Sequence, residues 1–168
     1  MTKWAGFQLG TIIFIGLLIV GKQLYNQQIT DFISSFNFGI QPSFMIMFLT
    51  VVVTIWACAL LFYWQNRKGN TSFTHKIWRI MPAISGGLLF LSILGFLILG
   101  LTVLSNVTPQ LHWLLDVFVV YFLMLFYLFI FSIVVRYGKQ EPPGNKVFTS
   151  AHIAVLITLI TLFFIPGI

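Results

Sequence analysis

The sequence predicts an all-α polytopic membrane protein, a bundle of five transmembrane helices with its N-terminus inside the cell and its C-terminus outside. Three observations lead to this fold class. Hydrophobic residues make up 59% of the chain and charged residues only 7%, whereas soluble domains carry roughly 25% charged residues. The hydrophobic residues form five blocks of about 20 residues, the length that crosses a bilayer core of about 30 Å. The basic residues gather in alternate gaps between these blocks.

The distribution of Lys and Arg predicts the orientation. Only Lys22 lies in a gap of one parity, and the other eight basic residues precede the first block or follow the second and fourth blocks: Lys3, Arg67, Lys68, Lys76, Arg79, Arg136, Lys139 and Lys146. Because cytoplasmic loops retain Lys and Arg, the eight residues are predicted inside. The net charge of +6 then reflects the topology, because the basic loops lie next to the anionic inner leaflet. No nucleic-acid partner is expected.

The five predicted spans occupy the whole chain, 1–168, as a single transmembrane domain. They cover residues 4–21, 43–64, 80–104, 113–135 and 147–165. The polar and aromatic segment 22–41 between the first two spans favours a short helix in the membrane interface, where aromatic side chains are enriched. The second span opens at Pro42, and the Pro-Pro-Gly turn at 141–144 separates the fourth span from the fifth.

Two spans carry small residues at helical spacing. The first span contains Gly6 and Gly10, and the third contains Ala83 and Gly87, each pair four positions apart. Small residues at this spacing allow helices to approach closely in a membrane. We therefore predict helix packing at these four positions.

Asp116 lies four residues after His112 at the start of the fourth span, so the two share one helix face. The carboxylate could orient the imidazole as second-shell support for a metal or haem ligand. The alternative is an interfacial pair in which the acid is favoured by the helix N-terminus.

His75 and His152 both fall near the predicted inner side, before the third span and within the fifth. Paired imidazoles from separate helices hold b-type haem, so His75, His112 and His152 are candidate cofactor ligands and haem is the candidate cofactor. The alternative for His75 is a solvated loop residue.

The sequence contains no Ser/His/Asp set, paired acidic metal site, Walker loop or H-E-x-x-H motif. Hydrolysis and phosphoryl transfer therefore lack their usual residues, and we expect a protein that is not an enzyme. The lone Cys58 lies inside the second span and forms no disulfide motif.

The order of features resembles the small multi-pass haem–copper oxidase (cytochrome aa3-type) maturation family of Gram-positive bacteria. The resemblance rests on Ile40-Gln41-Pro42-Ser43 before the second span, His75-Lys76 in the basic loop, His112 on the outer side and His152 near the inner side. It covers roughly residues 41–164. It implies that His75, His112 and His152 match the family's histidines, that the chain lies in the bacterial cytoplasmic membrane, and that it helps to mature an oxidase.

Three functions remain open at this point. The first is a membrane accessory protein that acts by helix–helix contact with another integral membrane protein and has membrane lipids as its other partners. The second is a b-type haem-binding, electron-transfer membrane protein. The third is a small transporter component or immunity-type membrane protein.

The predicted orientation is testable with reporter fusions. Alkaline phosphatase fused after Ile168 should be active, because the enzyme works only outside the cytoplasm, and the same enzyme fused within 141–144 should be inactive. The reverse pattern of activities would show that the basic gaps lie outside.

Overall fold

The computed structural model describes residues 3–36, 41–67, 76–102, 112–138 and 142–164. These residues are helical and contain no strand. The five long helices are α1 (Lys3–Leu24), α3 (Pro42–Arg67), α4 (Met81–Thr102), α5 (His112–Tyr137) and α6 (Pro143–Phe164); the two short elements are α2 (Asn26–Ser34) and the 3-10 helix η2 (Lys76–Arg79). All five long helices are long and apolar enough to cross a membrane. The predicted all-α fold with five spans is confirmed, and its orientation stays a prediction.

Several helices extend beyond the apolar blocks that predicted them. Helix α3 continues through Gln65 and Asn66 to Arg67, and α6 begins at Pro143, four residues before its predicted span. The backbone hydrogen bonds of a helix do not depend on apolar side chains, and proline suits the first helical position. Helix α1 likewise continues past 21 and includes Lys22, which corrects the assignment of this residue to the connecting segment.

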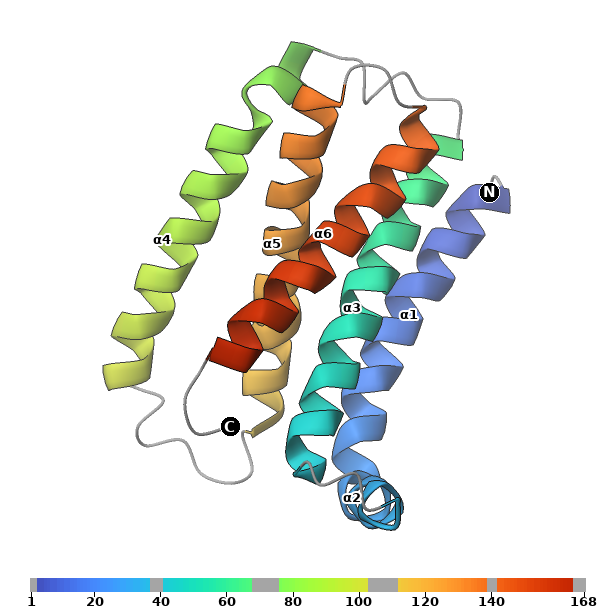
Figure 1. Cartoon of the computed structure of the whole chain (residues 1–168), viewed down its shortest axis with the longest axis vertical. Coiled ribbons are helices and arrows are strands. Elements are labelled where there is room, and N and C mark those ends of the chain that lie inside the picture. Colours follow the sequence, from blue (N-terminus) through green and yellow to red (C-terminus); the bar gives the residue numbers. More distant parts are fainter. Residues whose placement is uncertain (1–2, 37–40, 68–75, 103–111, 139–141, 165–168) are drawn as a thin grey trace.

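The long helices alternate in direction, and α3 and α5 are the central ones (Figure 1). Helix α3 packs against α1, α5 and α6, whereas α5 packs against α4, α6 and α3. Helices α1 and α4 lie on opposite edges of the bundle, and α2 crosses the end of the bundle where α1 stops (Figure 1). Because five helices alternate, α1 begins at one end of the bundle and α6 ends toward the other.

The core lies where α3, α5 and α6 meet. Tyr127 and Phe131 of α5 pack against small residues on both neighbours, including Cys58 of α3 and Ala151 of α6, and all four are almost fully buried. The buried polar groups are bonded: Tyr127 Oη donates to the carbonyl oxygen of Val147 at 3.2 Å and accepts from Ser150 Oγ at 3.2 Å. Small residues let the helices approach, and dispersion contacts then stabilise the packing.

At the end where α1 begins, side chains join α1 to α3. Gln8 Nε2 donates to Gln65 Oε1 at 2.9 Å. Close by, the Phe7 and Trp64 rings stack with centroids 4.7 Å apart. A tryptophan and a pair of amides suit the membrane interface, where apolar groups contact lipid and polar groups contact water.

The small residues pack differently from the sequence-based expectation. A Cβ built at Gly6, Gly10 or Gly87 meets no heavy atom within 4 Å among the described residues, and Ala83 is exposed. Among the described residues, the three glycines therefore mediate no close contact with another helix, and Ala83 lies on the surface. The close approach of α4 to α5 occurs one position earlier, at Gly86, where an added Cβ would lie 3.0 Å from Phe129. Packing of the other four against a partner stays a prediction.

The two adjacent glycines of α4 form a matched pair for mutation. Gly86→Leu should lower the thermal stability of the detergent-solubilised protein, because a side chain forced against Phe129 costs about 1–3 kcal/mol as overpacking does elsewhere. Gly87→Leu should leave the melting temperature unchanged, because its side chain enters open space. Equal destabilisation by both substitutions would contradict the contact of α4 with α5.

Candidate functional site

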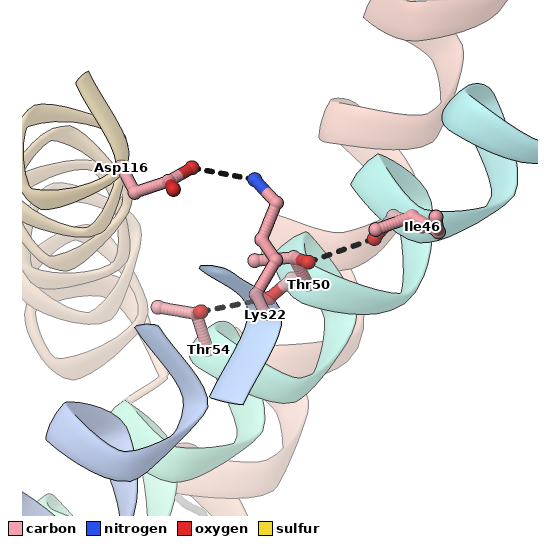
Figure 2. Close-up of polar contacts among 5 residues, drawn as sticks. All are labelled: Lys22, Ile46, Thr50, Thr54 and Asp116. Carbon is pink, nitrogen blue, oxygen red and sulfur yellow. Dashed lines mark hydrogen bonds and ion pairs between the residues drawn. The ribbon is translucent and has the colours of Figure 1, made fainter. Parts of the chain in front are cut away.

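An ion pair joins α1 to α5 near the end of the bundle crossed by α2. Nζ of Lys22 donates to Oδ1 of Asp116 at 2.5 Å, and 31% and 21% of the two side chains are exposed. Figure 2 shows the lysine side chain extending past α3 to reach the carboxylate. Ionisable residues within spans are rare, because a charge costs about 2.5–3.5 kcal/mol or more at the bilayer centre, and they commonly mark a functional site.

Each partner occupies the helix end that favours its charge. Lys22 lies in the last turn of α1, where the partial negative charge of the helix C-terminus attracts a cation. Asp116 is the fifth residue of α5, close to the partial positive charge at that helix N-terminus. The helix ends and the direct contact therefore act in the same direction on the two side chains.

The ion pair lines a cavity of about 510 Å³ between α1, α2, α3 and α5, called here the polar cavity. Every one of the four helices contributes polar residues to it: Lys22, Asn26, Thr30, Ser43, Thr50, Thr54 and Asp116. The rest of its wall is aliphatic, with Ile15, Leu18 and Val120 among the residues. Its volume and its few convergent polar groups are typical of a small-molecule site between helices.

The threonines of the polar cavity have a defined hydrogen-bond direction. Thr50 Oγ1 donates to the carbonyl oxygen of Ile46, and Thr54 Oγ1 donates to that of Thr50, each at 2.7 Å (Figure 2). Thr30 Oγ1 donates in the same way to Asn26 at 2.7 Å. A hydroxyl has one hydrogen and two lone pairs, so each of these oxygens can offer only an acceptor to the cavity.

Asp116 has a partner on another helix that its spacing did not suggest, because its carboxylate binds Lys22 of α1. The expected second-shell support of His112 stays a prediction. His112 is the first residue of α5, and its side chain lies outside the described part of the chain, as does the whole of His75. The proposed pairing of His75 with His152 falls outside the described residues for the same reason.

His152 is exposed on α6 and its ring is held on two sides. Nδ1 lies 2.8 Å from the carbonyl oxygen of Phe148, and the ring meets Trp56 edge-on with centroids 5.4 Å apart. Because a carbonyl can only accept, Nδ1 is the donor, and in the neutral form of the ring the lone pair is on Nε2. Among the described residues, no group of three or more His, Cys, Asp and Glu side chains could hold a metal ion.

Lys22 was missed as a site residue, although the sequence contained a signal for it. It is the one basic residue outside the gaps that hold the other eight, and Asp116 is the one acidic residue inside a predicted span. A basic and an acidic residue that both lie at unusual positions are candidates for an ion pair, because pairing lowers the free-energy cost of placing each charge near the membrane.

Comparison with known proteins gives no family for this chain: no family model matches it, and neither a curated protein nor a solved structure is significantly similar to it.

A double-mutant cycle tests the ion pair. Lys22→Met or Asp116→Leu alone should destabilise the detergent-solubilised protein by about 1–3 kcal/mol, less than the 3–5 kcal/mol of a fully buried pair, because each leaves one charge without its partner. The double variant should recover most of the loss, with a coupling energy of at least about 1 kcal/mol. Asp31→Leu on the exposed side of α2 is the control. Additive effects of the two substitutions would show that the contact contributes nothing to stability.

Proposed function

We propose that this chain is a membrane accessory protein that acts by binding another integral membrane protein through helix–helix contact, and that it is not an enzyme. The observation that carries the proposal is the outward face of α4. Ala83 and Gly87 are exposed there, and the same face continues along the helix through exposed Leu91 and Leu94. Small residues four apart beside large aliphatic ones are typical of a surface that receives a second helix in lipid.

The position of α4 supports this proposal. The helix lies at the edge of the bundle and packs against α5 and η2 (Figure 1). Its contacts with α5 use the opposite face, where Ser85 Oγ lies 3.2 Å from Ser132 Oγ and Gly86 faces Phe129. Within the described part of the chain, the face that holds Ala83 and Gly87 points away from α5, so a partner can bind there while α4 stays attached to its own bundle.

The resemblance to the oxidase maturation family suggests the identity of this partner. In this proposal the chain lies in a bacterial cytoplasmic membrane, and α4 contacts a subunit of a respiratory haem–copper oxidase during its assembly. The histidines would then take part in the maturation of the oxidase. Among them, the structure describes the side chain of His152, whose Nδ1 is used by the Phe148 carbonyl and whose Nε2 can bind a ligand.

Photo-crosslinking in cell membranes tests the proposal. A crosslinking amino acid at Leu91 should capture an oxidase subunit, and Gly87→Leu should reduce the yield about ten-fold, which corresponds to about 1.4 kcal/mol. Gly16→Leu on α1 is the matched control, since its side chain also enters open space but on the other edge helix. Capture of lipid alone, or an equal yield from the Gly87→Leu variant, would refute the contact through α4.

The geometry of His152 favours b-type haem binding as a second candidate function. An Nδ1–H held by a backbone carbonyl fixes the ring and directs Nε2 outward, as in many histidine ligands of metals. The purified protein should then show a sharp α band after reduction with dithionite, and His152→Ala should remove it. A featureless spectrum from protein purified with haem present would eliminate this candidate.

A further inference from the structure

Lys22 lines two hollows that share part of their walls. One is the polar cavity, and the other is an apolar groove of about 610 Å³ between α1 and α3. The apolar groove is lined by Phe14, Leu17, Gly21, Tyr25, Leu49 and Val53. Four residues line both hollows, namely Leu18, Lys22, Ile46 and Thr50. A single ligand could therefore place an apolar part in the groove, pass Lys22 and reach the polar cavity.

The length of the apolar groove fits one leaflet of a bilayer. Along α1 it extends from Phe14 to Tyr25, which are eleven positions apart. At about 1.5 Å per residue this is about 16 Å, close to half of a hydrocarbon core of about 30 Å. The groove ends at Lys22 and Tyr25, near the end of the helix, where lipid headgroups begin.

The polar cavity can bind a ligand that carries both a negative and a positive group, because Lys22 and Asp116 both line it. The ammonium of Lys22 has three donors and its contact with Asp116 uses one, so an anionic oxygen can bind beside it. The carboxylate of Asp116 and the acceptor oxygen of Thr50 suit a donor-rich cation. A purely anionic headgroup would place its charge against Asp116, and a quaternary ammonium has no N–H to donate to these oxygens.

We propose that this end of the bundle binds a phospholipid with a phosphoethanolamine headgroup. The sequence of chemical groups in this lipid, acyl chain, phosphate and primary ammonium, matches the order of apolar groove, Lys22 and Asp116 in the structure. Lys22 binds the phosphate, Asp116 and the Thr50 oxygen bind the ammonium, and one acyl chain lies between α1 and α3. The proposal does not depend on the accessory function of α4, which lies on the other edge of the bundle (Figure 1).

Lipid retention by the full-length purified protein tests this binding. The delipidated protein is incubated in mixed micelles with equal amounts of dioleoyl phosphatidylethanolamine, phosphatidylglycerol and phosphatidylcholine, and the bound lipid is counted by native mass spectrometry. The ethanolamine lipid should be retained about ten-fold more than either of the others, which corresponds to about 1.4 kcal/mol. Asp116→Asn should abolish the preference over phosphatidylglycerol, whereas Asp31→Asn on exposed α2 should preserve it.

Further measurements keep the result decisive. If Asp116→Asn does not fold, the Lys22→Met, Asp116→Leu double variant replaces the ion pair by apolar groups of similar size, which buried pairs often tolerate, and it should bind all three lipids equally. Water-soluble phosphoethanolamine should stabilise the protein far less than the lipid; equal stabilisation would show that a free headgroup, and not a lipid, is the ligand. Equal retention of the three lipids by the unmodified protein, or an unchanged preference in the folded variants, would overturn the proposal.

Discussion

The bilayer core offers no hydrogen-bond partner, and this constraint shapes every level of the described structure. Backbone groups must bond within their own segment, so the spans are helices. The same constraint acts on side chains: Thr50, Thr54 and Thr158 each donate a hydroxyl hydrogen to the carbonyl four residues earlier. Among the described buried side chains, no nitrogen or oxygen lacks a partner. Polar chemistry is thereby confined to places where helices bring complementary groups together, and Lys22 with Asp116 is such a place.

Because water is absent, hydrophobicity alone does not hold the helices to each other. Their association depends on close packing, and the structure places its small residues accordingly. Ala151 and Ala154 of α6 and Ala57 and Ala59 of α3 are nearly fully buried. Ala59, Ala151 and Ala154 belong to the same core cluster as the large ring of Tyr127, which is also hydrogen-bonded to α6. The outer helices α1 and α4 are instead held along one face each, which leaves wide surfaces for lipid or protein.

The five spans were predictable because any membrane-crossing helix must be apolar over about 20 residues, whatever its neighbours. The contacts between spans were not, since they depend on the rotation of each helix about its axis. Gly86 and Gly87 differ by one position, about 100° around α4, and only the first faces α5. Asp116 shows the same limit: its spacing to His112 along one helix was visible in the sequence, but its bond to Lys22 of α1 was not. The predicted roles of His75 and His112 concern side chains outside the described residues.

The long sequence separation of the ion pair affects how the protein is made. Lys22 and Asp116 are 94 residues apart, and chains are synthesised at about 5–20 residues per second. Lys22 is therefore synthesised roughly 5–20 s before its counter-ion. During that interval the ammonium must reach the headgroup region at the end of its helix. Helix α1 can pack against α3 before the fourth span is made, but its ion pair with α5 forms only after that span has been inserted.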